Sequence, residues 1–105
     1  MTTVYKDARN NWAAEDEISL PNGQQLRIST HKVYSGNLVT TATVGRLEGG
    51  FFSYVMFQDF SKRVITQKPA KCTGRIVEGQ HATALADIET LKQEITDFYS
   101  VPQPA

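Results

Sequence analysis

Residues 26 to 44 read LRISTHKVYSGNLVTTATV, and this stretch decides the fold. Its first six residues alternate Leu, Ile and Thr with Arg, Ser and His, which is the period-two pattern of a strand with one buried face. Ser35-Gly36-Asn37 supplies a turn, because Gly and Asn accept the positive φ that tight hairpins require. The residues after this turn are rich in Val and Thr, which favour strands over helices. The stretch therefore predicts an antiparallel hairpin.

Further turns extend this hairpin into a β-meander. Pro21-Asn22-Gly23 precedes it, Glu48-Gly49-Gly50 follows it, and an aromatic-rich strand is expected from Phe51 to Phe60. Loops of so few residues join antiparallel neighbours, since a parallel crossover needs a dozen or more residues. A further short strand is expected at residues 61–66, and Pro69 should end regular pairing. We therefore expect an antiparallel meander of about four strands within residues 16–66.

One long amphipathic C-terminal helix is predicted over residues 78–99. Its apolar stripe has spacings of three and four residues and is formed by His81, Ala84, Ile88, Leu91, Ile95 and Phe98. Two prolines follow, so residues 101–105 are expected to be a frayed tail. The spacing also suits a short coiled coil, but packing against one face of the sheet is favoured.

The expected fold class is therefore α+β, with residues 1–105 forming a single domain. Residues 1–15 carry no clear period and are either an N-terminal strand or a loosely attached arm, with Trp12 as its anchor. One helix covers only one face of a sheet, and a meander leaves edge strands that need protection. The second face is then solvated, covered by the arm, or covered by another copy. We expect a homodimer.

Length and composition agree with a small globular protein. The chain has 105 residues, of which 40% are hydrophobic and 21% charged, and this is ordinary for one folded domain. Its single cysteine, Cys72, cannot form an internal disulfide. The N-terminus lacks the apolar segment of a secretory signal, and no apolar run approaches the roughly 20 residues that span a bilayer. We expect a cytoplasmic protein that does not enter a membrane.

The formal net charge is zero, but the charges are segregated along the chain. Between residues 18 and 77 only Glu48 and Asp59 are acidic, whereas eight residues are cationic: Arg27, Lys32, Arg46, Lys62, Arg63, Lys68, Lys71 and Arg75. Residues 1–17 and 78–105 both carry an excess of acids. The sheet region is therefore basic and the helix acidic, which suggests a polyanionic partner or an assembly of opposite charges.

Catalytic and metal-binding motifs do not stand out. His31 lies on the polar face of its strand, His81 lies on the helix stripe, and neither has a nucleophile placed beside it by a known spacing. Lys71 and Arg75 flank Cys72, but no active-site cysteine motif surrounds it. One cysteine and two histidines cannot form a closed zinc site, and no glycine pattern matches a nucleotide loop. We expect no enzymatic activity, no metal and no cofactor.

The basic run at residues 61–77 is the candidate functional region. It holds five cations and no acid before Glu78, and phosphate backbones bind to such clusters. Single-strand binders add aromatic side chains on a sheet face, because every base has a stacking face. The predicted nucleic-acid-binding residues are therefore Lys62, Arg63, Lys68, Lys71 and Arg75, with Tyr54 or Phe52 stacking on bases. In the alternative, both aromatic sets of residues 51–60 are buried and the basic run complements the acidic helix.

Two functional hypotheses follow. In the first, the chain is a small non-enzymatic accessory protein that binds nucleic acid (DNA or RNA) through its basic sheet region. In the second, it is a protein-binding adaptor or inhibitor, of a phage or plasmid type, that uses the open sheet face or an edge strand. The sequence leaves open the identity of the partner, the oligomeric state, and whether the basic region faces a partner or the acidic helix.

Overall fold

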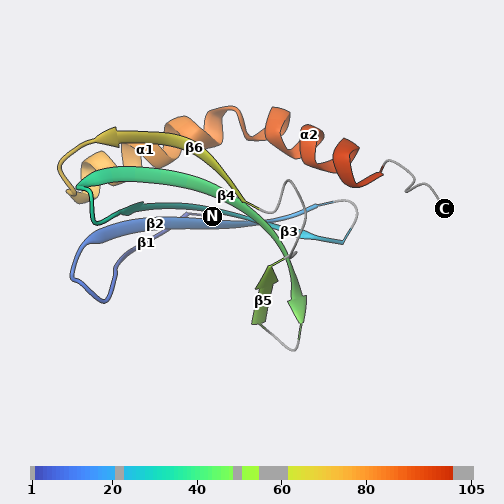
Figure 1. Ribbon diagram of the computed structural model, residues 1–105, viewed down its shortest axis with the longest axis horizontal. Helices are drawn as coiled ribbons and strands as arrows, with labels where there is room; N and C mark the ends of the chain where they lie inside the picture. Colours follow the sequence, from blue (N-terminus) through green and yellow to red (C-terminus); the bar gives the residue numbers. More distant parts are fainter. Residues whose placement is uncertain (1, 21–22, 49–50, 55–61, 101–105) are drawn as a thin grey trace.

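The protein is a single antiparallel sheet with two helices on one face, and a computed structural model describes residues 2–20, 23–48, 51–54 and 62–100 (Figure 1). The strands are β1 (Thr3–Lys6), β2 (Trp12–Ser19), β3 (Gln25–Lys32), β4 (Asn37–Glu48), β5 (Phe51–Tyr54) and β6 (Lys62–Pro69). The helices are α1 (Gly74–Ala86) and α2 (Ile88–Ser100). The predicted α+β class and antiparallel sheet are confirmed.

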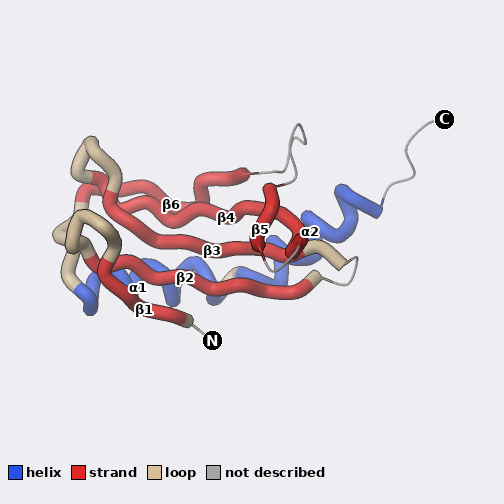
Figure 2. The backbone as a smooth tube through the Cα atoms, turned by 90° about the horizontal axis from the view of Figure 1, so that it is seen from below, coloured by secondary structure: helices blue, strands red, loops and turns tan. Residues whose placement is uncertain are grey.

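Strand β4 is the centre of the sheet. The first five strands follow one another in chain order, and β6 returns to pair with β4 instead of β5. One edge of β4 pairs with β3, while its other edge pairs with β6 over Asn37–Thr43 and with β5 over Gly45–Glu48. Beyond the β6 pairing, the end of β4 and β5 turn away from the helices and out of the plane of the sheet (Figures 1 and 2). The six-stranded sheet therefore differs from the expected meander of about four strands.

The N-terminal residues belong to the sheet. β1 pairs with β2 from Thr3↔Glu15 to Lys6↔Trp12, so the strand alternative of the two predictions for residues 1–15 is the one found. The sequence of β2 conceals the strand because it buries two adjacent residues, Ala13 and Ala14, and one acid, Asp16. Its burial pattern is therefore not a simple alternation of apolar and polar residues.

The helical segment begins earlier than predicted and is divided. Thr73 caps α1 by accepting the Ile76 backbone N–H on its side-chain oxygen at 3.2 Å. Asp87 separates α1 from α2, so the prediction of one long helix over residues 78–99 is wrong in this detail. The apolar stripe runs across this break without losing its phase, which explains why the spacing alone concealed it.

The apolar core lies between the sheet and the helices. Leu26, Ile28 and Val44 are fully buried on the helix-covered face, and Ile95 of α2 is buried against them. A smaller cluster under the start of α1 contains Leu38 and Val77, with Trp12 packed at its border. The expected packing of the helical segment on one sheet face is confirmed. None of the helices in the described ranges has the length and apolar character needed to cross a bilayer.

The opposite face of the sheet carries no helix within the described ranges. Figure 2, which views the molecule from this side, shows the strands in front of the helices and β5 projecting from the sheet. Ser29 and His31 point to this face, as the alternation in β3 predicts, and both are partly exposed. We refer to it as the open face.

Replacing Ile95 with Ala should show how strongly α2 depends on the sheet. The side chain is fully buried in the main core, and such truncations cost about 2–5 kcal/mol of unfolding free energy. Ile76→Ala on α1 is the control, because Ile76 is 37% exposed and should cost less than about 1 kcal/mol. Equal decreases in stability for the two variants in chemical denaturation would contradict this packing.

Candidate functional site

The structure places the side chains of only three of the seven residues that the sequence predicts for the site. Phe52 and Tyr54 lie in β5, and Lys62 and Arg63 lie where β6 begins, but the side chains of these four residues are outside the described part. The remaining three occupy the other end of β6 and the start of α1, and all are exposed: Lys68, Lys71 and Arg75. The basic run is thus spread along β6, and only its last three cations are placed by the structure.

A row of residues across the sheet brings other cations to Lys68. Lys6 pairs with Trp12, Lys32 pairs with Leu38, and Leu38 pairs with Lys68 on its other side. The β2–β3 register, continued two residues past its last pair, sets Trp12 beside Lys32. Lysines from β1, β3 and β6 therefore share one row at the same end of the sheet.

The start of α1 is joined to this row through Trp12. The Cys72 thiol donates a hydrogen bond to the Trp12 carbonyl oxygen at 3.1 Å. Gly74 lies over the indole, since a Cβ added there would meet the ring carbons at 3.6 Å. Lys71 and Arg75 flank these contacts in the chain. The α1 N-terminus adds partial positive charge, and its first turn contains no acid that would offset it.

Two turns complete this end of the molecule, which we call the basic end. The β1–β2 turn, the β3–β4 turn and the β6–α1 connection lie together at the left of Figures 1 and 2. The basic end carries six cations: Lys6, Arg9, Lys32, Lys68, Lys71 and Arg75. Asp7 and Glu78 are its acids. Among the residues that the structure describes, none of the six cations is in an ion pair.

The Asp7 carboxylate holds the β1–β2 turn through hydrogen bonds to its backbone, and it is in no described ion pair with the cations of the basic end. Its Oδ1 atom accepts the backbone N–H groups of Arg9 at 2.9 Å and Asn11 at 3.0 Å. The hydrogen bond from Asn11 is the main reason that the pKa of Asp7 lies below its ordinary value of 3.8, and the Arg9 N–H and charge add to it. Asn10 takes the left-handed conformation, with φ 62°, that closes this turn.

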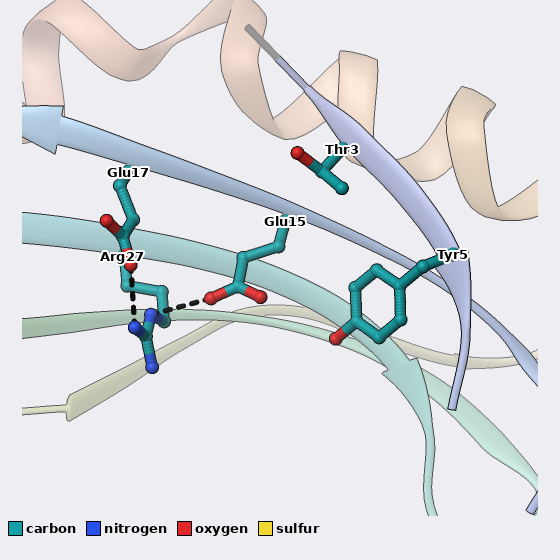
Figure 3. Close-up of a pocket in the computed structure, with 5 residues that line it drawn as sticks. All are labelled: Thr3, Tyr5, Glu15, Glu17 and Arg27. Carbon is teal, nitrogen blue, oxygen red and sulfur yellow. Dashed lines mark hydrogen bonds and ion pairs between the residues drawn. The ribbon is translucent and has the colours of Figure 1, made fainter. Parts of the chain in front are cut away.

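A second candidate is a hollow of about 540 Å³ on the open face (Figure 3). Thr3, Tyr5, Glu15, Glu17 and Arg27 line it. Arg27 Nε lies 2.6 Å from Glu15 Oε1, and Arg27 Nη2 lies 2.6 Å from Glu17 Oε1. Burial, and then the nearby Glu15, raises the pKa of Tyr5. Both carboxylates bind the same guanidinium, so these acids of β2 are paired with a residue of the neighbouring strand.

The third candidate is a chain of buried polar groups between α1 and the sheet. His81 Nε2 lies 2.7 Å from Asp16 Oδ2, and since a carboxylate only accepts, Nε2 carries the proton. His81 Nδ1 lies 2.7 Å from the Thr30 hydroxyl oxygen, and that oxygen lies 2.7 Å from the Thr40 hydroxyl. Gln80 donates to Thr40 at 3.1 Å. These hydrogen bonds can all run in one direction, from Gln80 to Asp16, when His81 Nδ1 accepts from Thr30.

The order Asp16–His81–Thr30 is that of the acid, histidine and nucleophile of a catalytic triad, but here the hydroxyl and the imidazole are buried. Thr30 has no exposed surface, and His81 has 1%. A hydroxyl that substrate cannot reach is not a usable nucleophile in this conformation. His81, which the sequence places on the helix stripe, therefore joins α1 to β2 and β3. Across the described ranges, no group of three His, Cys, Asp or Glu side chains is placed to hold a metal ion.

Asp16 is the ionised residue among these buried polar groups. Burial favours its neutral form, but the hydrogen bond that Thr2 donates at 2.6 Å and the hydrogen bond and charge of His81 outweigh burial. The pKa of Asp16 consequently lies below its ordinary value of 3.8. A carboxyl whose pKa is lower in the folded than in the unfolded state stabilises the fold above its unfolded pKa. That contribution disappears as the pH falls through the folded pKa.

We expect Asp16→Asn to lower the unfolding free energy at pH 7 by about 1.5–3 kcal/mol, because the variant has no charged hydrogen-bond acceptor at this position. The loss of stability of the wild-type protein between about pH 5 and pH 3 should be shallower in this variant. Thermal unfolding followed by circular dichroism at several pH values measures both effects. Asp97→Asn, which changes an exposed helix carboxylate, should keep the wild-type slope. An unchanged slope in Asp16→Asn would contradict the assignment.

The site predicted from the sequence omits half of the basic end. Lys6 and Arg9 fall in a segment without periodicity, and Lys32 lies thirty-six positions before Lys68. The pairing of β4 with both β3 and β6 brings Lys32 and Lys68 to the two sides of Leu38. Comparison with known proteins adds nothing to these contacts: no protein-family model, no curated protein and no solved structure matches this chain.

Proposed function

We propose that this chain is a small nucleic-acid-binding protein whose basic end contacts the phosphate backbone. The observation that supports this most is the convergence of six cations from β1, the β1–β2 turn, β3, β6 and the start of α1. Within the described residues these cations have no carboxylate partner, so their charge remains available to an outside anion. Clusters of this kind bind phosphates and release counterions from them.

The distribution of acids supports the same surface. α2 carries Glu89, Glu94 and Asp97, and it extends away from the basic end (Figure 1). The Lys92 ammonium group lies 3.4 Å from Glu89, so the one cation of α2 is paired within its own helix. The acidic helix therefore does not neutralise Lys68, Lys71 or Arg75. A polyanion meets attraction at one end of the molecule and repulsion at the other.

A homodimer remains a proposal. β6 pairs with no described strand on its outer edge, but it contains Lys62, Arg63, Lys68 and Pro69, and such residues discourage edge-to-edge pairing. A dimer is better supported through the open face, which no described helix covers. Light scattering should then give twice the 11.7 kDa mass of the chain. A mass of one chain at high concentration would contradict it.

The triple variant Lys68→Ala, Lys71→Ala and Arg75→Ala tests the basic end. In mobility shifts at about 50 mM salt, it should bind mixed DNA and RNA oligonucleotides about tenfold or more weakly than the wild type. The slope of log affinity against log salt should also become shallower, by roughly 0.7–0.9 for each phosphate that the variant no longer neutralises. Absence of any binding by the wild type under these conditions would overturn the proposed function.

Two controls locate the binding surface. Lys92→Ala removes a cation from the acidic helix and should leave binding unchanged. The double variant Lys62→Ala and Arg63→Ala removes charge about 15–20 Å along β6 from Lys68. It should weaken binding less than the triple variant. A larger effect of the double variant would move the binding surface away from the basic end and toward the sheet region predicted from the sequence.

A further inference from the structure

Tyr34 is the most exposed large hydrophobic side chain among the described residues. It retains 95% of its surface, whereas Tyr5, Val64 and Ile76 retain 36–51%. The residue lies at the tip of the β3–β4 hairpin, within the basic end. An aromatic ring that packs on nothing in the core contributes little to folding. Such a residue at a loop tip is better explained by contact with another molecule.

The hairpin holds this ring in a defined position. The Val33 carbonyl accepts the Gly36 N–H at 3.0 Å, and the Val33 N–H donates to the Asn37 carbonyl at 3.0 Å. Gly36 has a φ of +90°, a conformation that L side chains rarely adopt. Tyr34 is therefore carried on a closed turn, and a binding partner does not have to order this turn before it binds.

Arg9 fixes the ring from the neighbouring turn. Its guanidinium carbon lies 4.5 Å from the centre of the Tyr34 ring, within the range of a cation–π contact. The same guanidinium donates from Nη2 to the Lys32 carbonyl at 3.1 Å. The hydrogen bonds that Asp7 accepts from the turn backbone hold Arg9 in this place. A ring and a cation are thus joined at the tip, with Lys32 nearby in the chain.

We propose that Tyr34 is a stacking platform for an unpaired base and that the ligand of the basic end is single-stranded nucleic acid. This inference rests on the proposed function and specifies its substrate class. In a duplex both faces of each base are covered by neighbouring base pairs, so a ring on a hairpin tip finds only the backbone and the groove edges. A single strand offers exposed base faces to the ring, and its phosphates face Arg9 and the lysines beside it.

In the alternative, the contact between Tyr34 and Arg9 has only a structural role, which is to hold the two turns together. A purely structural contact would contribute to stability, and its loss would change the binding of all ligands of the basic end equally. A stacking platform would affect single strands and spare duplexes. The two roles are therefore separated by comparing ligands within one variant.

The test measures fluorescence anisotropy with labelled oligo(dT) and oligo(U) of about 16 nucleotides, and with the corresponding dT·dA duplex, at about 50 mM salt. Tyr34→Ala should weaken binding of one or both single strands by about tenfold and change duplex binding less than about twofold. Tyr34→Phe retains the ring and should stay within about twofold of the wild type for every ligand. The two single strands distinguish DNA from RNA as the source of the bases.

Tyr5→Ala is the matched control, because it removes a partly exposed tyrosine that lines the open-face hollow beside Glu15. It should leave single-strand binding unchanged. Tyr34→Trp supplies a readout that does not depend on affinity: single strands should quench its added fluorescence, measured against the Trp12 signal of the wild type, and duplexes should not. This readout also decides the outcome if Tyr34→Ala proves to be unstable.

Two results overturn the inference in different ways. If Tyr34→Ala binds single strands like the wild type while the Lys68, Lys71 and Arg75 triple variant does not, the proposed function stands and the stacking role is wrong. The same conclusion follows if Tyr34→Ala weakens duplex and single-strand binding equally, or if Tyr34→Trp is not quenched. If the wild-type protein binds no oligonucleotide, the proposed function fails, and the inference fails with it.

Discussion

The pairing of β4 on both of its edges determines the rest of the structure. This strand of twelve residues is long enough to pair with β3 along one edge and with β6 and β5 in succession along the other. Because β6 is antiparallel to β4, it carries the chain back to the end where β4 began. The β6–α1 connection must then lie beside the β3–β4 turn. This pairing places the β6–α1 connection at the β3–β4 turn, and the β2–β3 pairing places the β1–β2 turn at the same end, so the basic end is the result.

The two helices are held on the sheet by different forces. α2 buries Ile95 in an apolar cluster, which is the usual way for an amphipathic helix to cover a sheet. α1 buries Val77 and Ala84 as well, but it also buries Gln80 and His81 among hydroxyl groups of β3 and β4 and the carboxylate of β2. Hydrogen bonds are directional and apolar contacts are not, so α1 is set in one register on the sheet. The N-terminus of α1 is thereby placed over Trp12, where it belongs to the basic end.

The local parts of this fold are readable in the sequence, and the long-range parts are not. The alternation in β3 predicts which residues face the core, and it is correct for Leu26, Ile28 and Thr30. The helix stripe correctly identifies the buried positions His81, Ala84 and Ile95. It overlooks the interruption at Asp87, because the apolar period continues through it. No local pattern shows that β6 leaves β5 and pairs with β4, since that choice is made by contacts between residues 19 to 32 positions apart.

The residues of the candidate site also divide into those that are visible in the sequence and those that only the fold brings together. Lys68, Lys71 and Arg75 are visible as a basic run, but Arg9 and Tyr34 become partners only when two turns meet. In the sequence, Arg9 is one charge of an acidic N-terminal segment, and Tyr34 is a residue beside a turn. The only local sign is an aromatic residue next to the turn sequence Ser-Gly-Asn, where polar side chains are common. An exposed ring at such a position is informative because hairpin geometry, not packing, keeps it there.

A net charge of zero is compatible with binding a polyanion when the charges are separated. The basic end and α2 lie at opposite ends of the long direction of the molecule, so among the described side chains positive and negative charge are separated along it (Figure 1). A phosphate backbone that approaches the acidic end is repelled, and one that approaches the basic end is attracted. In the proposed complex, this charge separation would turn the Tyr34 hairpin toward the polyanion before any contact forms. Salt should weaken this orientation together with the binding itself, because both arise from the same charges.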